Sequence, residues 1–147
     1  MPWRKQSKER VTLLLATSIS GTEKLTTLMI EKSRNPMSFK GIKPFPLLHE
    51  ANKKSWMTSE FFSEWLKQTN KKMCKEKKKI VLFIDNYMAH SLIPQMNAVK
   101  VVFLPPNTTS KLQPLDQGII RSFKVFYRKE RVKKVVDSID KKHNIAV

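Results

Sequence analysis

The strongest constraint on the fold of this chain is an unbroken apolar run, Ile80–Ile84, which ends directly at Asp85 and Asn86. A strand that exposes one face would alternate apolar with polar residues, so this run predicts a strand that is covered on both faces and central in its sheet. A second run, Val99–Leu104, predicts a parallel neighbour, and two prolines end it. The predicted sheet therefore carries a carboxylate at the end of its central strand.

Two further strands are predicted nearer the N-terminus. Val11–Ser18 and Leu25–Ile30 are both apolar and β-rich, and Ser20-Gly21-Thr22 between them is typical of a turn. Together these segments predict a hairpin. Residues 32–50 contain three prolines and no strong periodicity, so they predict an irregular connection.

Helical periodicity marks two segments. In TSEFFSEWLKQTNKKM, residues 58–73, Thr58 is a suitable N-cap, and Glu60 lies in the first turn, where the helix dipole favours a negative charge. A longer amphipathic helix is predicted from about Pro114, because proline suits the first helical turn. The apolar positions are Phe61, Phe62, Trp65, Leu66 and Met73 in the first helix, and Ile119, Ile120, Phe123, Tyr127, Val132, Val135, Val136 and Ile139 in the second.

The resulting order, β-β-α-β-β-α, predicts an α/β fold. The 147 residues suffice for one domain with a real core, so a single domain is expected over residues 1–147, with residues 1–8 disordered. No apolar run approaches the ~20 residues of a membrane span, and MPWRKQSKER lacks the apolar region of a secretory signal, so no membrane partner is expected. Cys74 is the only cysteine, which fits a reducing, intracellular compartment.

The charge of the chain predicts a polyanionic partner. Lys and Arg total 29 against 12 Asp and Glu, a formal net charge of +17, and nucleic acid is the most obvious polyanion. The alternative is a lysine-rich protein whose charged faces are only solvated. The same choice applies to the lysine-rich run Lys75–Lys79, which is interpreted as a solvated loop, with a DNA contact as the alternative.

Asp85 and Asp116 form a candidate pair of acids, although thirty residues lie between them. In an α/β fold, ligands gather at the carboxyl ends of strands, and a helix after the neighbouring strand can return its N-terminus to that edge. Two carboxylates at such a site repel each other and invite a hard cation such as Mg²⁺ or Mn²⁺. The alternative needs no metal, since an Asp is also favoured in the first turn of a helix and an Asp-Asn pair often begins a turn.

Several long motifs resemble one family. They are SKERVTLLLATSISGTEKL, EKSRNPMSFKG, ANKKSWMTSEFFSEWL, VLFIDNYMAH and VVFLPPNTTSKLQPLDQGIIRSFKVFYRK, and they run from about Ser7 to Asp140. In their combination the chain resembles the DDE superfamily endonuclease domain of Tigger/pogo-class transposases, a branch of the Tc1/mariner group, and the proteins derived from them. The resemblance implies an RNase H-like fold and a triad of acids that holds two divalent metal ions.

The resemblance also implies roles for particular residues. Asp85 matches the second acid, on the central strand, and Asp116 matches the third, on the closing helix. Asn86 and His90 belong to the same strand-end motif and are assigned support of the site or contact with DNA. For His90 a simple turn residue is an equal alternative.

The chain departs from the family at its N-terminus. In the family the first acid lies on the strand before KERVTLLL, whereas the first Asp here is Asp85. Glu9, Glu23 and Glu31 precede it, but none stands in the context of the first acid. The chain is therefore expected to be an N-terminally truncated DDE domain that lacks the first strand of its sheet and the helix-turn-helix region of the family.

These observations predict a transposase-derived, DNA-binding domain that is catalytically defective and nuclear, with Mg²⁺ or Mn²⁺ weakly bound or absent. Two alternatives are kept. One is an active metal-dependent endonuclease or transposase, which would need a third carboxylate such as Glu9 or Glu23. The other is a non-functional relic of a transposable element, because the loss of a central strand leaves unpaired edges and exposed apolar surface.

Overall fold

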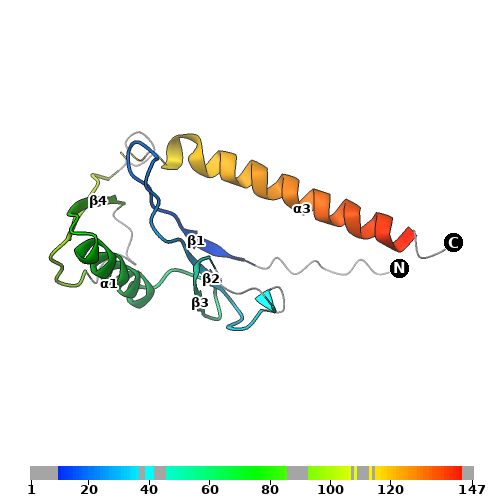
Figure 1. Cartoon of the computed structure of the whole chain (residues 1–147), viewed down its shortest axis with the longest axis horizontal. Coiled ribbons are helices and arrows are strands. Elements are labelled where there is room, and N and C mark those ends of the chain that lie inside the picture. The colour runs from blue at the N-terminus through cyan, green and yellow to red at the C-terminus, as the bar shows by residue number, and fades with distance from the viewer. Residues whose placement is uncertain are drawn as a thin grey trace. The chain divides into compact units, whose positions relative to one another are not determined.

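The computed structural model describes residues 10–36, 39–41, 46–85, 93–106, 108, 113 and 115–143 (Figure 1). The chain divides into two compact units, an N-terminal unit of residues 1–106 and a C-terminal unit of residues 107–147. The predicted mixed α/β class is confirmed, while the RNase H-like arrangement and the missing first strand stay predictions. None of the helices in the described ranges combines the length and the apolar composition that a membrane span requires.

A three-stranded sheet opens the N-terminal unit. Strand β1 (Thr12–Leu14) pairs antiparallel with β2 (Leu28–Glu31), which confirms the predicted hairpin. Both strands are shorter than predicted, and only an isolated bridge between Thr17 and Lys24 continues the pairing. Gly21 closes the turn with a backbone φ of 73°, a left-handed conformation that glycine adopts without steric cost.

The third strand of this sheet was not predicted. Strand β3 (Leu48–Ala51) pairs in parallel with β2, so the prediction of an irregular connection over residues 32–50 is wrong at its C-terminal end. All four residues are half-buried, without the alternation that identifies a strand from its sequence. His49 Nε2 lies 3.2 Å from Glu31 Oε1 and joins the side chains of the two strands.

Helix α1 (Ser59–Lys75) agrees with the prediction in its position, its cap and its buried face. The Thr58 hydroxyl accepts a hydrogen bond from the Phe61 backbone N–H at 3.3 Å, which satisfies one of the free donors of the first turn. The sequence segment after the helix turns sharply, since Lys77 has a φ of 55°. The buried residues of α1 are Phe62, Trp65, Leu66, Thr69 and Met73.

A separate parallel pair is formed by β4 (Ile80–Ile84) and β5 (Val99–Phe103). Their position and direction confirm the prediction, but the expectation that β4 is central and covered on both faces is wrong for the described residues. Here β4 pairs with β5 alone, and Val81 and Phe83 are each 51% exposed. Successive side chains of a strand point to opposite faces, and only the face that carries Ile84 packs into the core.

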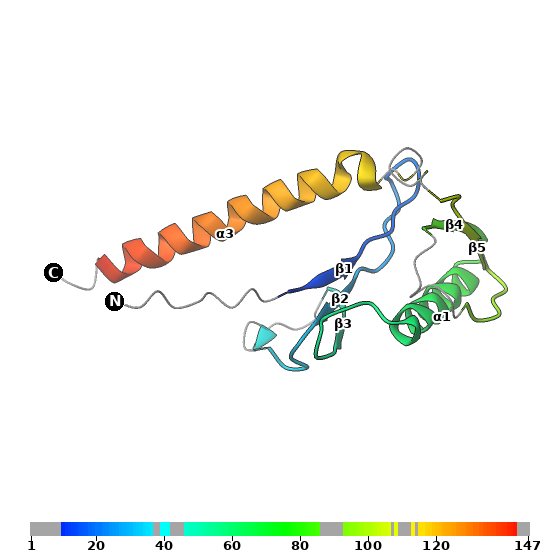
Figure 2. The same ribbon diagram turned by 180° about the vertical axis from the view of Figure 1, so that it is seen from behind.

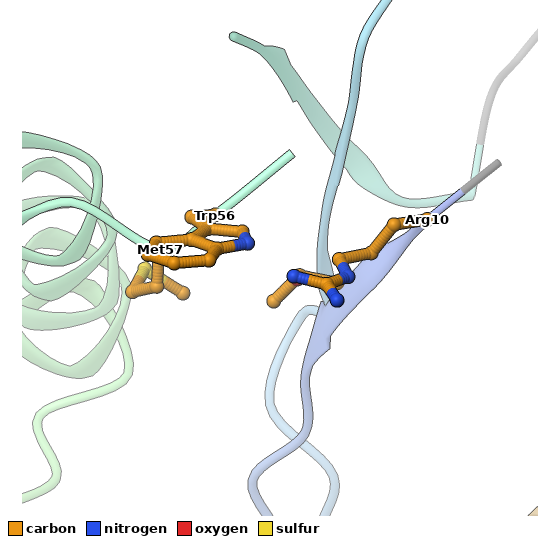
Figure 3. A pocket seen from close by; sticks show the side chains of 4 residues that line it. Arg10, Trp56 and Met57 are labelled. Atoms are coloured by element: carbon orange, nitrogen blue, oxygen red, sulfur yellow. The ribbon is translucent and has the colours of Figure 1, made fainter. Parts of the chain in front are cut away.

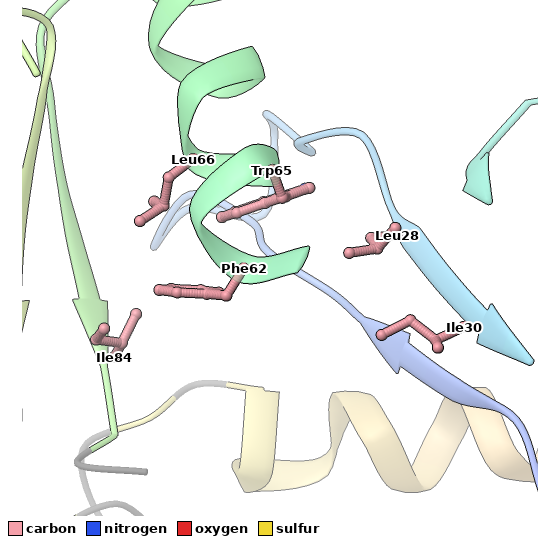
Figure 4. Close-up of a cluster of buried hydrophobic side chains, with 6 residues drawn as sticks. All are labelled: Leu28, Ile30, Phe62, Trp65, Leu66 and Ile84. Carbon is pink, nitrogen blue, oxygen red and sulfur yellow. The ribbon is translucent and has the colours of Figure 1, made fainter. Parts of the chain in front are cut away.

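Helix α1 joins the two sheets through a shared core, and Figure 2 shows it beside both of them. Figure 4 shows Phe62, Trp65 and Leu66 of α1 between Ile84 on one side and Leu28 and Ile30 on the other. The Trp65 indole N–H donates to the Thr26 carbonyl at 2.9 Å, so even the polar atom of this buried ring is satisfied. Burial of each such side chain stabilises the fold by about 1.5–3 kcal/mol.

In the C-terminal unit, residues 115–143 form a continuous helical segment. A π-helical turn, η3 (Leu115–Ile119), leads into α3 (Ile120–His143), which confirms the predicted long helix. Gly118 in the π-turn has a φ of 128°. Ile120 is half-buried, and the apolar residues from Phe123 onward are exposed, from 40% at Phe123 to 66% at Phe126.

Candidate functional site: strand-end acid, basic helix and exposed tryptophan

Asp85 lies at the carboxyl end of β4, as predicted. The preceding carbonyl, that of Ile84, accepts a hydrogen bond from the Leu104 N–H at 2.8 Å, so β4 and β5 stay paired up to the residue before the acid. Asp85 itself is half-buried. The carboxyl ends of both parallel strands meet at this edge, which is the edge where α/β folds place ligands.

Asp116 lies in η3, the turn that begins the helical segment of the C-terminal unit. A carboxylate at the start of a helix is stabilised by the free N–H groups of the first turn, with or without a metal. Asp85 and Asp116 belong to different units, and their proximity stays a prediction. Asn86 and His90 lie outside the described residues, so their assigned roles also stay predictions.

The three acids that precede Asp85 in the sequence analysis, Glu9, Glu23 and Glu31, have other partners or lie outside the described residues. Glu23 accepts a hydrogen bond from Lys78 Nζ at 2.7 Å, and this bond lowers the pKa of Glu23 and raises that of Lys78. Glu31 pairs with His49 at 3.2 Å, and Glu9 is not described. Within the described ranges no three His, Cys, Asp or Glu residues come together, so these side chains alone do not fit a site for two metal ions.

Helix α3 presents a row of unneutralised positive charge. Arg121, Lys124, Arg128 and Arg131 are exposed and follow one another at spacings of three and four residues, which places them on one face of the helix. In the part of the chain that the structure describes, none of the four forms an ion pair with an acid. We call this set the basic stripe.

The lysine-rich run after α1 has a different character. Lys75 ends the helix, where a cation interacts favourably with the helix dipole. Lys78 contacts both Glu23 and Glu76, at 2.7 and 3.3 Å. Lys78 therefore has a structural role, because its ion pairs connect the hairpin to the end of α1.

A further cluster was missed by the sequence analysis. Trp56 is 47% exposed in the connection between β3 and α1, with the Arg10 guanidinium carbon 5.7 Å and Lys54 Nζ 5.4 Å from the centre of its ring. Arg10, Thr12, Trp56 and Met57 line a pocket of about 310 Å³ (Figure 3). The signal in the sequence is the string KKSW, in which an aromatic residue follows two cations.

Comparison with known proteins shows the family to which the chain belongs. The model of the DDE superfamily endonuclease family matches residues 8–146, so the chain belongs to this family. The match extends over both units and includes Asp85 and Asp116. No solved structure gives a significant match.

Individual relatives place the chain within the Tigger/pogo-like proteins. It is 37% identical to Tigger transposable element-derived protein 4 of Mus musculus over 92% of this chain and 26% of the relative. It is 30% identical to ARS-binding protein 1 of Schizosaccharomyces pombe, over 88% of this chain and 27% of the relative. It is 28% identical to human major centromere autoantigen B, over 92% of this chain and 22% of the relative. The chain thus spans about a quarter of the length of these curated relatives.

Proposed function

We propose that the chain is a transposase-derived domain that binds DNA through non-specific phosphate contacts, with the basic stripe of α3 as a principal contact surface. The observation that carries this proposal is the row of four exposed, unpaired cations on one helix face, in a chain of net charge +17. Lys and Arg side chains bind DNA by neutralising phosphates and releasing the counterions that surround them.

The names of the relatives support DNA as the partner. One relative is named for binding to ARS and another for the centromere. Both names point to chromosomal sites, and a protein that binds there works in the nucleus. We therefore propose a nuclear location for this chain as well.

An experiment with two matched sets of variants tests the role of the basic stripe. Replacement of Arg121, Lys124, Arg128 and Arg131 by Gln removes four charges, as does replacement of Lys71, Lys75, Lys77 and Lys79. Each lost phosphate contact should reduce the salt slope of duplex binding, log K against log [salt], by about 0.9 in magnitude. By that rule the slope should fall in magnitude by roughly 3 to 4 in the stripe variant, and by much less in the lysine variant. Equal losses would show that α3 is not a preferred contact surface.

We further propose that Asp85 and Asp116 are the second and third acids of the DDE triad. Their places at a strand end and at a helix start support this role, as does the match of the family model. Mg²⁺ or Mn²⁺ would be held by these two carboxylates, weakly, because neither Glu23 nor Glu31 is free to complete the set. A bound ion would supply electrostatic stabilisation of a phosphate. The 147-residue chain is therefore expected to cleave DNA little or not at all.

A nicking assay on supercoiled plasmid, with Mg²⁺ and with Mn²⁺, separates this proposal from an active endonuclease. The wild-type chain and Asp85→Ala should both leave the plasmid intact. Addition of a preceding strand with an Asp should raise cleavage, and Asp116→Ala in that longer chain should abolish it. Robust nicking by the 147-residue chain that is lost in Asp85→Ala would contradict the defect and would direct the search for the third acid to Glu9 and Glu23.

A further inference from the structure

We propose that Trp56, with Arg10 and Lys54 beside it, is a stacking site for an unpaired nucleobase, through which this domain holds single-stranded nucleic acid. The inference rests on the proposed nucleic-acid function and adds a second binding mode to it. The basic stripe would contact the phosphates of a duplex. The Trp56 site would distinguish a strand whose bases are unpaired.

The exposure of Trp56 is the first step. The other described tryptophan, Trp65, is 3% exposed, and its indole N–H is bonded to a carbonyl in the core. Trp56 is 47% exposed and borders an open pocket of about 310 Å³, a volume at the lower end of the range for ligand sites, which is roughly 300–1,000 Å³. Figure 3 shows Trp56 and Met57 on one side of this space and Arg10 on the other.

The second step is the rigidity of the segment that carries Trp56. The Asn52 side chain bonds both backbone groups of Trp56: its amide donates to the Trp56 carbonyl at 2.7 Å, and its oxygen accepts from the Trp56 N–H at 3.1 Å. Thr12 Oγ1 donates to the Ser55 carbonyl at 2.7 Å and ties the same segment to β1. A ring that is held before the ligand arrives loses less entropy when it binds.

The third step is the charge around the ring. Arg10 and Lys54 lie over the ring, 5.7 and 5.4 Å from its centre, which is within cation–π range. Both are long, flexible side chains, so a base that stacks on the indole would displace one of them from the ring face. Lys53 precedes Lys54, and residues 52–58 include no acid. A base on the indole would thus have cations beside it for the neighbouring phosphates.

Together these features match the chemistry of single-strand binding. Proteins that bind unpaired strands combine a positively charged path for the backbone with aromatic rings on which bases stack. Paired bases in a duplex are already stacked on each other and leave no face for the indole. The site should therefore accept single-stranded DNA or RNA with little preference for sequence, because every base offers a π-face.

The test compares binding of the 147-residue chain to oligo(dT), oligo(rU) and duplex DNA of equal length at one salt concentration. Trp56→Leu keeps apolar bulk but removes the ring, and Trp56→Phe keeps a smaller ring. We expect Trp56→Leu to weaken single-strand binding about tenfold, with duplex binding unchanged, and Trp56→Phe to recover most of the loss. Circular dichroism would verify that both variants keep the wild-type fold.

A fluorescence measurement identifies the ring itself. Tryptophan emission should be quenched when oligo(dT) binds to the wild-type chain and to Trp3→Phe, but not when it binds to Trp56→Phe. Quenching with oligo(rU) as well would show that the site reads the base and not the sugar, which supports the same inference.

The outcomes separate this inference from the proposed function. Unchanged single-strand binding in Trp56→Leu, or an equal loss on single strands and on duplex, would overturn the stacking site while duplex binding still stands. Absence of binding to every nucleic acid by the wild-type chain would overturn the stacking site and the proposed function together.

Discussion

At the scale of single residues, side chains that bond to backbone groups fix the connections around α1. Thr58 caps the helix, Asn52 holds the segment before it, and the Asn70 side chain accepts the Ala98 N–H at 2.9 Å ahead of β5. Each of these groups replaces water at a backbone atom that secondary structure leaves unpaired. Removal of one such side chain should therefore lower the free energy of unfolding by more than its small size suggests.

The cap of α1 gives the first prediction. Thr58→Ala should lower the free energy of unfolding by about 1 kcal/mol, because the Phe61 N–H loses its acceptor. Thr58→Ser is the matched control, since it keeps the hydroxyl and should retain most of the stability. Urea unfolding followed by circular dichroism measures both variants. A loss as large in Thr58→Ser as in Thr58→Ala would show that the methyl group, and not the cap, is responsible.

At the scale of elements, α1 is the centre of the N-terminal unit. Its buried face contacts the β1–β3 sheet and the β4–β5 pair, which share no hydrogen-bonded strand in the described part of the chain. Phe62 is 1% exposed and lies stacked near Trp65, with ring centres 6.0 Å apart. Loss of this ring would leave a cavity between the two sheets.

The second prediction concerns this junction. Phe62→Ala should lower the free energy of unfolding by about 3–5 kcal/mol, through lost burial and the cavity that remains. Phe126→Ala in α3 is the matched control, because Phe126 is 66% exposed and its loss should change stability little. Thermal and urea unfolding would measure both. A Phe62→Ala variant as stable as the control would contradict the role of α1 as the shared core.

The elements also show what a sequence can reveal. An apolar run predicted β4, and helical spacing predicted α1 and the helix after Pro114. Capping rules predicted the N-cap at Thr58. Strand β3 was missed because neither β-branched residues nor alternation mark Leu48–Ala51, and its pairing with β2 is set by the tertiary fold. The prediction that β4 is central was wrong because an unbroken apolar run does not require both faces of a strand to be buried. Only one face of β4 contacts the core, and Phe83 on the other face is 51% exposed.

The candidate site was predictable to a similar extent. The position of Asp85 at a strand end followed from the sequence, because the apolar run stops at that residue. The Trp56 site did not, since it depends on Arg10, forty-six positions earlier in the chain, and on the hydrogen bonds of Asn52. Contacts between distant segments of this kind leave no periodic signal along the chain.

At the scale of the whole molecule, the net charge of +17 determines which kind of partner the chain binds. A charge of this size opposes the compact state by self-repulsion and strongly favours association with a polyanion. Each unit carries exposed cations: the C-terminal unit has the basic stripe of α3, and the N-terminal unit has the lysines after α1. Binding to DNA would relieve the repulsion, so DNA should also raise the midpoint of thermal unfolding.

The salt dependence of duplex binding tests the central claim most directly. Equilibrium binding of the 147-residue chain to a short duplex would be measured over a series of salt concentrations. Each neutralised phosphate contributes about −0.9 to the slope of log K against log [salt], so several contacts should give a slope of roughly −4 or steeper. A slope near zero, or no retention of duplex DNA at low salt, would contradict the account and remove nucleic acid as the partner.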